Sequence, residues 1–279
     1  VYPKFEKMLI DKLNYLADKK KDPEELGGVL KAYQLSNNPK YKVIKQSGFL
    51  FYTEAWNTSK IDPVTGFVNL FDTHYENILK SKNFFSKFDL IKYNSAKDWF
   101  EFSFDYNNFT TKAEGSKTKW TLCTFGNRII SFRNPDNNMQ WDGKEINLTE
   151  EFKLFFEKFG ININSDLHTE ILKKDKKDFF EGLLHLLKLT LQMRNSKTGT
   201  DIDYMQSPVA DENGVFYNSN KCGKSLPENA DANGAYNIAR KGLMIIDKIK
   251  KSDNLNKIDL TISNKEWLVF AQNKPYLKN

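Results

Sequence analysis

Cysteine is scarce in this sequence. Only two occur among its 279 residues, Cys123 and Cys222, and they form no Cys-x-x-Cys pair. A zinc ribbon and a disulfide scaffold are therefore excluded, and the scarcity fits a reducing, cytoplasmic setting. Long hydrophobic runs are missing as well. No apolar stretch reaches about 18 residues and no signal peptide opens the chain, so membrane insertion and secretion are not expected.

Histidine is also rare. The three histidines, His74, His168 and His185, have no metal-ligand spacing. His185 falls within a predicted helix and is expected to be a packed or surface residue rather than a catalytic base. The sequence contains no Ser-His-Asp order, no Walker loop and no dinucleotide-binding fingerprint, which argues against the common hydrolase triads and nucleotide-binding classes.

The chain does contain enough apolar surface for buried cores. Hydrophobic residues make up 39% of the sequence and aromatic residues 14%, which argues against wholesale disorder. The length allows one large domain or two of ordinary size. The net charge of +6, from 42 Lys and Arg against 36 Asp and Glu, is a mild basic excess. It fits a polyanionic partner without requiring one.

Helical and strand-like segments both occur along the chain. Helices are predicted over 3–18, 149–160, 176–194, from Asp231 onward and around 267–272. Strands are predicted over 48–52, 100–106, 120–125, 129–132 and 258–262, with those between 100 and 132 forming an antiparallel set. The run Asp62-Pro63-Val64-Thr65-Gly66 predicts a turn and a domain edge.

Asp231 stands at the start of a predicted helix, within the run Ala230-Asp231-Ala232-Asn233-Gly234-Ala235. A carboxylate in this place accepts hydrogen bonds from free backbone amides, so the plainest interpretation is an N-cap. The same fixed orientation also suits a metal ligand. The small residues around it would let another element, or a phosphate backbone, approach closely.

Arg194 continues the apolar stripe of the helix predicted over 176–194, and the run Gln192-Met193-Arg194-Asn195-Ser196-Lys197 follows its last leucine. At a helix end an arginine gains from the helix dipole. On the apolar face its guanidinium needs a carboxylate or a phosphate, and the spacing leaves both partners open. Asp203 is the best-placed acid to orient it, whereas Asp201 and Asp211 are expected to be solvated.

Basic residues alternate with aromatic ones in the segment from Lys112 to Arg133. This pattern is compatible with a nucleic-acid groove, but it slightly favours the solvated face of an ordinary sheet. The candidate nucleic-acid contacts are Ser196, Lys197, Lys117, Lys119 and Arg128.

Several long runs make the chain resemble the C-terminal part of the type V-A CRISPR effector nucleases, the Cpf family of RNA-guided DNA endonucleases. The matching runs are residues 2–10, 27–35, 58–69, 192–199, 207–211 and 230–238. They occur in one order, and the resemblance extends over essentially the whole chain.

The resemblance implies a fold with α/β and α+β character: a partial ribonuclease H-like, RuvC-type domain interrupted by an inserted α+β Nuc domain. Residues 1–65 resemble the end of the second RuvC segment, 66–229 the Nuc insert and 230–279 the third RuvC segment. Asp231 matches the Mg²⁺-binding carboxylate of the last segment. Arg194 and Asp203 match residues implicated in handling the DNA strand, so these three are the expected catalytic set.

The resemblance also implies a two-metal Mg²⁺ site whose other two carboxylates precede Val1, so the 279 residues alone are expected to be nearly inactive. The intact parent is expected to be a monomeric, cytoplasmic prokaryotic protein that cuts target and single-stranded DNA. Its guide RNA would bind mainly to upstream domains. Two alternatives remain: a non-catalytic module that guides single-stranded DNA, or a purely structural role for the arginine and aspartates.

Overall fold

The computed structural model describes residues 55–138, 140–253 and 259–273, together with Lys4, Phe5, Met8, Lys12, Asp18, Lys20, Lys21 and Thr53. The chain divides into a larger unit, of residues 57–235 and 268–279, and a smaller one, of residues 1–56 and 236–267. The strand predicted over 48–52 and most of the helix predicted over 3–18 lie outside the described residues.

A three-stranded antiparallel sheet forms the centre of the larger unit. It contains β1 (Phe88–Asn94), β2 (Trp99–Asp105) and β3 (Lys119–Cys123), in the order β1-β2-β3. Along β2 buried residues alternate with half-buried ones, as the period of two predicts for a strand with one face in the core. Phe100, Phe102 and Phe104 are the buried residues of this strand.

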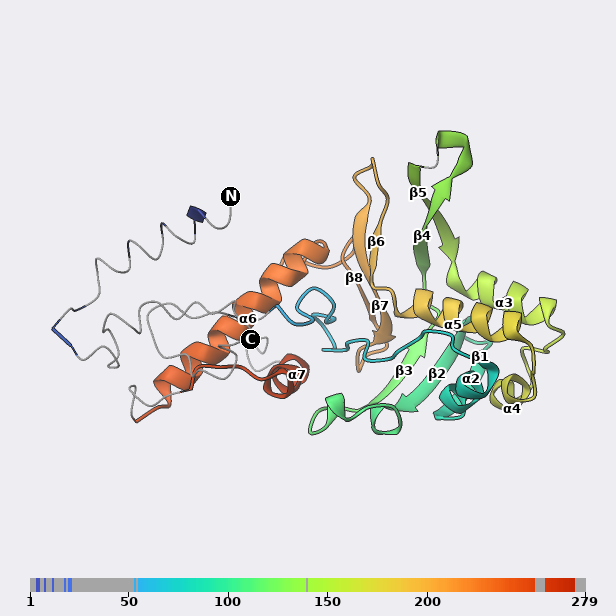
Figure 1. The fold of residues 1–279 in the computed structure, drawn as a ribbon, viewed down its shortest axis with the longest axis horizontal. Helices are drawn as coiled ribbons and strands as arrows, with labels where there is room; N and C mark the ends of the chain where they lie inside the picture. The colour runs from blue at the N-terminus through green and yellow to red at the C-terminus, as the bar shows by residue number, and fades with distance from the viewer. Residues whose placement is uncertain are drawn as a thin grey trace. The chain divides into compact units, whose positions relative to one another are not determined.

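Helices complete the core around this sheet. They are α2 (Ile78–Phe85), α3 (Leu148–Lys158), α4 (Leu167–Leu172) and α5 (Lys177–Leu191), and α3 lies beside α5 in Figure 1. The Asn147 side chain caps α3 by accepting from the backbone N–H of Glu150. Phe152 and Phe156 then reach the ring of Phe100 at centroid distances of 5.4 and 5.3 Å. The predicted helix over 149–160 is thus confirmed.

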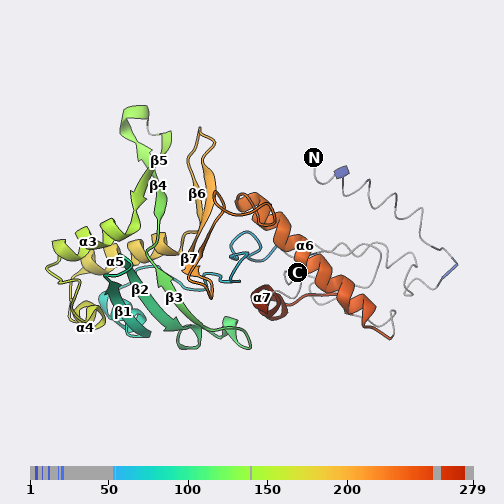
Figure 2. The same cartoon turned by 180° about the vertical axis from the view of Figure 1, so that it is seen from behind.

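Two smaller antiparallel sheets project from this core in the same direction (Figures 1 and 2). One pairs β4 (Asn127–Asn134) with β5 (Gln140–Asn147). The other has the order β6-β7-β8, from β6 (Arg194–Ser196), β7 (Asp203–Ala210) and β8 (Phe216–Asn218). Short 3-10 turns cover Tyr106–Asn108, Thr111–Ala113 and Pro135–Asn137. The predicted antiparallel set is therefore two sheets, because β4 pairs with β5 rather than with β3.

The turn predicted at residues 62–66 is confirmed. Asp62 is fully buried, and its carboxylate accepts from the N–H of Val64 at 2.7 Å and from the hydroxyls of Thr65 and Ser207, each at 2.6 Å. Gly66 has φ of +73°, and a Cβ there would lie 2.6 Å from the Cα of Gln272. Only glycine permits this approach of the two segments.

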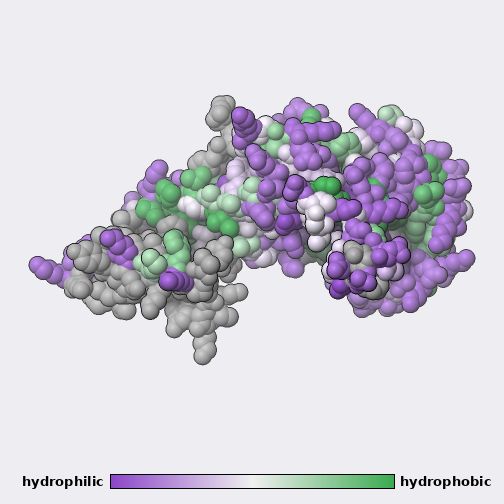
Figure 3. All heavy atoms as spheres, turned by 90° about the horizontal axis from the view of Figure 1, so that it is seen from above, coloured by the Kyte–Doolittle hydropathy of each residue, from purple (hydrophilic) through white to green (hydrophobic). Residues whose placement is uncertain are grey.

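Two helices follow toward the C-terminus, α6 (Ala230–Lys250) and α7 (Asn264–Asn273), as predicted. Ile258 lies outside the described residues, and residues 259–262 form no strand. The described fold is thus a mixed α/β structure of small antiparallel sheets and helices. Hydrophilic residues cover most of the face of the larger unit seen in Figure 3, with hydrophobic residues in small patches between them. No described helix is long and apolar enough to cross a membrane.

Candidate functional site

The β6–β7 hairpin positions Arg194 and Asp203. β6 alternates exposed, buried and exposed, so Arg194 and Ser196 share the exposed face while Asn195 is buried. Ser196 pairs with Asp203 and Arg194 pairs with Met205. Directly opposed side chains in an antiparallel pair lie on the same face of the sheet. Arg194 and Asp203 are therefore diagonal neighbours on one face.

This placement corrects the prediction that Arg194 ends a helix. α5 stops at Leu191, and Gln192 adopts the extended backbone values φ −71° and ψ 109°. The backbone carbonyl of Met193 then accepts from the N–H of Gln206 at 2.8 Å, which begins the strand pairing. Arg194 is exposed and has neither the helix dipole nor the core-facing position that the apolar stripe predicted.

Buried Asn195 anchors the hairpin to β4. Its Oδ1 accepts from the N–H of Ile129 at 2.9 Å, and its Nδ2 donates to the carbonyl of Met193 at 3.2 Å. Gln192 donates from Nε2 to the carbonyl of Ile129 at 2.9 Å. The amides of this run therefore fix the backbone, and the arginine between them is held outward.

Arg194 joins the two predicted aspartates. Its Nε and Nη2 donate to Oδ1 and Oδ2 of Asp203 at 3.1 and 2.8 Å, and its Nη1 donates to Oδ1 of Asp231 at 3.3 Å. The hydrogen bonds to Asp203 are the main cause of a raised pKa at Arg194, which remains protonated. The Asp231 side chain is 83% exposed, so one of its oxygens is open to other partners. The structure thus brings all three predicted catalytic residues together.

A small apolar cluster beneath these side chains explains why they meet. It contains Met193, Met205, Tyr217 and Ala230. Met193 and Ala230 directly precede Arg194 and Asp231, and Met205 lies two residues after Asp203. Burial of these neighbours fixes β6, β7 and the start of α6 against one another. The two strands of one hairpin and the start of α6, which comes later in the sequence, are therefore held around one guanidinium.

Asp231 is not the helix cap that its position predicted. α6 begins at Ala230, and the N–H of Ala232 donates to Oδ1 of Asn229 at 2.9 Å, so Asn229 is the capping residue. The Asp231 carboxylate lies in the first turn, where the helix dipole favours a negative charge. Its side chain is thereby left available for Arg194.

The small residues after Asp231 do admit another element, as the sequence predicted. Asn233 is fully buried and donates from Nδ2 to the carbonyl of Ile61 at 2.9 Å. A Cβ added to Gly234 would lie 3.6 Å from the Cβ of Ser59. The segment that approaches is therefore the chain just before the Asp62 turn.

A cleft of about 360 Å³ opens beside the guanidinium of Arg194. Its polar lining consists of side chains that can donate hydrogen bonds, and none of the described residues lining it is acidic. These donors are Ser131, His185, Lys188, Gln192, Arg194 and Ser196. Such a lining suits the oxygens of a phosphate chain.

Sequence reasoning missed Lys188 and Ser131 as members of this cleft, and assigned His185 no role. His185 and Lys188 are three residues apart on the exposed face of α5, opposite its buried leucines. Their spacing of three residues in a predicted helix could have indicated that both side chains lie on one exposed face. Ser131 could not be assigned, because only the packing of β4 against the end of α5 brings it there.

Arg128 is not a surface contact, which corrects its prediction as a nucleic-acid ligand. It is fully buried and donates to the backbone carbonyls of Phe125, Asn127, Leu189 and Thr190 at 2.8–3.3 Å. Burial lowers its pKa to about 10, so the guanidinium stays charged at neutral pH. Arg128 ties β4 to the end of α5.

The other candidate contacts are on the surface or partly exposed. Ser196 lines the cleft of Arg194, and Lys197 lies 3.5 Å from Asp142 of β5. Lys117 stacks its ammonium 4.2 Å from the ring centre of Trp120, and Lys119 is exposed on β3. Their contact with nucleic acid stays a prediction.

Metal ligands do not gather at this site within the described part of the chain. There, no group of three His, Cys, Asp or Glu side chains is placed to hold a metal ion. Both carboxylate oxygens of Asp203 accept hydrogen bonds from Arg194. Of the two aspartates, Asp231 is therefore the one with an exposed carboxylate.

The fold and the site define a mixed α/β domain. It presents an arginine and a carboxylate on one hairpin, a second carboxylate at the start of α6, and a donor-lined cleft between β4, α5 and β6. A family model described as NUC, nuclease domain, matches residues 61–221, and the chain belongs to this family. Membership supports nucleic-acid cleavage, a hydrolase activity, as the general function. The matched range includes Arg194 and Asp203 and ends before Asp231.

Proposed function

We propose that the chain is the C-terminal nuclease portion of a type V-A CRISPR RNA-guided DNA endonuclease, and that Arg194 receives the DNA strand. The observation that carries this proposal is Arg194 itself, bound to Asp203 and Asp231 at the edge of a cleft that no acidic residue lines among those described. Membership of the nuclease-domain family and the motif resemblance support it. The proposed partition is 1–65 and 230–279 for RuvC segments and 66–229 for the Nuc domain.

Arg194 would bind a phosphate of the strand. Asp203 holds the guanidinium through two parallel hydrogen bonds, which fixes its plane. Its Nη1, at 3.3 Å from Asp231, makes the longest of the three bonds and is the donor most easily turned to a phosphate oxygen. Lys188 and Ser131 would contact neighbouring phosphates, so the strand would run along the end of α5.

A Mg²⁺ requirement fits these residues only in part. Asp231 offers an exposed oxygen ligand of the kind that Mg²⁺ prefers, yet the described residues do not complete a two-metal site. We propose that the remaining carboxylates come from segments preceding residue 1, as the resemblance implies. What the ion supplies when bound is activation of the attacking water and neutralisation of phosphate charge. The 279 residues alone would then be nearly inactive.

The parent would be a monomeric cytoplasmic protein, with guide RNA held mainly by upstream domains and target DNA delivered to this portion. A non-catalytic module that guides single-stranded DNA is the second candidate, because the described residues include a complete binding cleft but no complete metal site. DNA binding that survives Asp231→Ala, with no cleavage after the upstream segments are restored, would favour that candidate.

Titration of the chain with a fluorescent single-stranded oligonucleotide at several salt concentrations tests the proposal. Arg194→Ala and Lys188→Ala should each weaken binding and lower the slope of log K against log salt by about 0.7, the value for one single-strand phosphate contact. Lys176→Ala is the matched control, because Lys176 is an exposed lysine at the opposite end of α5. An equal loss in the control, or no loss in the Arg194 variant, contradicts the proposal.

A further inference from the structure

A second cavity lies on the other face of β7 from Arg194. It measures about 600 Å³ and is lined by residues from β4, β5, β7, β8 and the loop that follows β8. Tyr204 and Gln206 of β7 line this cavity. Asp203, the first residue of the same strand, is bound instead to Arg194. Because neighbouring side chains of a strand point to opposite faces, one strand serves both sites. This volume is within the range of small-molecule pockets.

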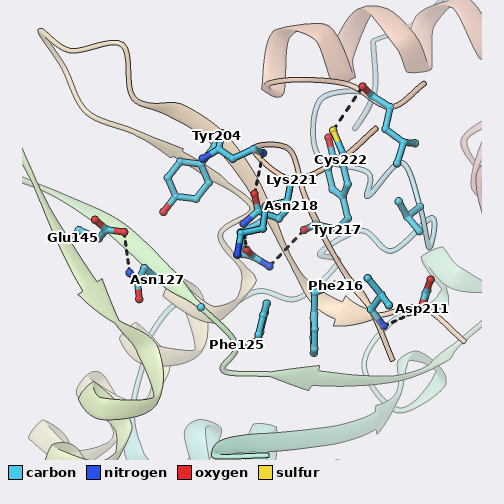
Figure 4. Close-up of a pocket in the computed structure, with 16 residues that line it drawn as sticks. Phe125, Asn127, Glu145, Tyr204, Asp211, Phe216, Tyr217, Asn218, Lys221 and Cys222 are labelled. Carbon is cyan, nitrogen blue, oxygen red and sulfur yellow. Dashed lines mark hydrogen bonds between the residues drawn. The ribbon is translucent and has the colours of Figure 1, made fainter. Parts of the chain in front are cut away.

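An aromatic pair forms one wall of the cavity. The rings of Phe125 and Phe216 lie parallel to each other in Figure 4. Their centroids are 4.3 Å apart and their planes are inclined by 14°. The ring of Trp99 meets both edge-on, at 5.8 and 5.3 Å, and keeps them in place. Each ring of this stack covers one face of the other, so a base can meet only an outer face, and half-buried Phe125 is the more exposed of the two rings. A fixed aromatic ring face at a cavity wall is the kind of surface on which single-stranded nucleic acids stack their bases.

Amide and hydroxyl groups face this wall from the strands around it. Asn218 donates to Oε1 of Gln206 at 2.7 Å, and Asn127 donates to Oε1 of Glu145 at 2.9 Å (Figure 4). Burial and the nearby Glu145 raise the pKa of Tyr204, so its hydroxyl stays neutral and can both donate and accept. The Asn218 amide carries a second hydrogen besides the one it donates to Gln206, and this donor and the Tyr204 hydroxyl are the groups that could meet the edge of a nucleobase.

The charged residues of the lining indicate which part of a nucleotide this cavity could hold, a base or a phosphate. The carboxylates of Glu145 and Asp211 are both part of the lining, and they would repel an anion. Lys221, an exposed residue of the lining, is the cation available to a phosphate outside the cavity. The polar groups also disfavour a wholly apolar ligand such as a lipid chain.

We propose that this cavity binds one unstacked nucleobase of the DNA strand handled at Arg194. The base would lie against the outer face of the Phe125 ring, with its edge toward Asn218 and Tyr204. This inference rests on the proposed function for its choice of DNA, but the cavity is separate from the Arg194 cleft. The two assignments can therefore fail independently.

Deoxyadenosine, thymidine and free deoxyribose are the probes, each titrated at millimolar concentration into the isotope-labelled 279-residue chain and followed by NMR. Both nucleosides should shift the side-chain amide signals of Asn218 and Gln206, and deoxyribose should not. Phe125→Leu, which keeps apolar volume but loses the ring, should weaken nucleoside binding about tenfold, in keeping with the usual contribution of one stacked base. Tyr204→Phe should preserve the fold and change the preference between the two nucleosides.

Phe132→Leu is the matched control, because Phe132 is an exposed aromatic residue on β4 that does not line the cavity. Nucleosides that bind no better than deoxyribose, or equally well to the Phe125 variant, overturn the assignment. Arg194→Ala should leave nucleoside binding unchanged. If that variant also binds the oligonucleotide as tightly as the wild type, the proposed function fails while the base pocket stands.

Discussion

Arg194 and Asp203 face each other diagonally across the β6–β7 hairpin, and the guanidinium holds both carboxylate oxygens, at 3.1 and 2.8 Å. The arginine is about half exposed and the aspartate about one third exposed. An exposed ion pair of this kind contributes little to stability because water and salt screen it. Its fork geometry instead fixes the direction in which the arginine presents its remaining donors.

Arg194→Lys should separate orientation from charge. Lysine retains the positive charge but has no planar fork, so it cannot hold Asp203 through two parallel bonds. The free energy of unfolding in urea should change by less than about 1 kcal/mol. Oligonucleotide affinity should fall toward that of Arg194→Ala. A purely structural arginine would give the reverse pattern, with lower stability in Arg194→Ala and unchanged strand cleavage by the complete protein.

At the start of α6, substitutions of Asn229 and Asp231 should distinguish a role in stability from a role in cleavage. Asn229→Ala removes the cap of the helix and should lower stability by about 1 kcal/mol. Asp231→Ala removes an exposed carboxylate and should change stability less, yet abolish strand cleavage once the upstream segments are restored. Thermal unfolding and a cleavage assay on the same two variants check this. Loss of cleavage in Asn229→Ala at a temperature where it is folded would count against a special role for Asp231.

The sequence predicted most elements with regular patterns and failed where a pattern was extended past its end. The alternation of Phe100, Phe102 and Phe104 identifies β2, because burial on one face of a strand leaves that mark. The leucine stripe of α5 was extended to Arg194, but the backbone leaves the helix at Gln192, and the carbonyl of Met193 then accepts from the N–H of Gln206. Nothing local to Gln192 announces that pairing, since its partner lies on another strand.

In the candidate site, too, some residues were predicted from the sequence and others were not. Motif similarity selected Arg194, Asp203 and Asp231, and the structure places them in contact. The spacing of basic and aromatic residues predicted that Arg128 is a surface cation, but its side chain is fully buried. Its ligands are backbone carbonyls, which have no side-chain signature in a sequence. The aromatic cavity was not predicted from the sequence. Phe125 and Phe216 lie 91 positions apart in the sequence and meet only through tertiary packing.

The two cysteines should differ in reactivity. Burial raises the pKa of the Cys123 thiol to about 12 and also raises that of half-buried Cys222. Because the thiolate is the reactive form, alkylation of both at pH 8 should be slower than for an ordinary cysteine. Cys222 should react first, and Cys123 only on unfolding. Mass spectrometry after timed iodoacetamide treatment checks this order, with Cys222→Ser as the control for site assignment.

The same shift has a consequence for stability. A thiol whose pKa is higher in the folded than in the unfolded chain contributes stability below the unfolded value, and this is lost as the pH rises toward the folded one. For Cys123 that window runs from its ordinary value near 9 to about 12. Cys123→Ala should therefore have a smaller decline in stability across this range than the wild type.

Gly66 tests the contact between the Asp62 turn and the end of α7. A Cβ at this position would meet the Cα of Gln272 at 2.6 Å and the carbonyl of Ala271 at 2.8 Å, and φ is +73°. Gly199 has a similar φ of +75° but no atom within 4 Å of such a Cβ. Gly199→Ala should therefore cost about 1 kcal/mol from backbone strain alone.

Gly66→Ala should cost at least about 1–3 kcal/mol more than Gly199→Ala, because backbone atoms must move to admit the methyl group. Urea unfolding of the two variants measures the difference. Hydrogen exchange should also become faster at the amides of Ala271 and Gln272 in the Gly66 variant alone, since the segment that yields is the one the methyl group displaces. Equal costs in the two variants would mean that the turn and α7 are not held at this distance in solution.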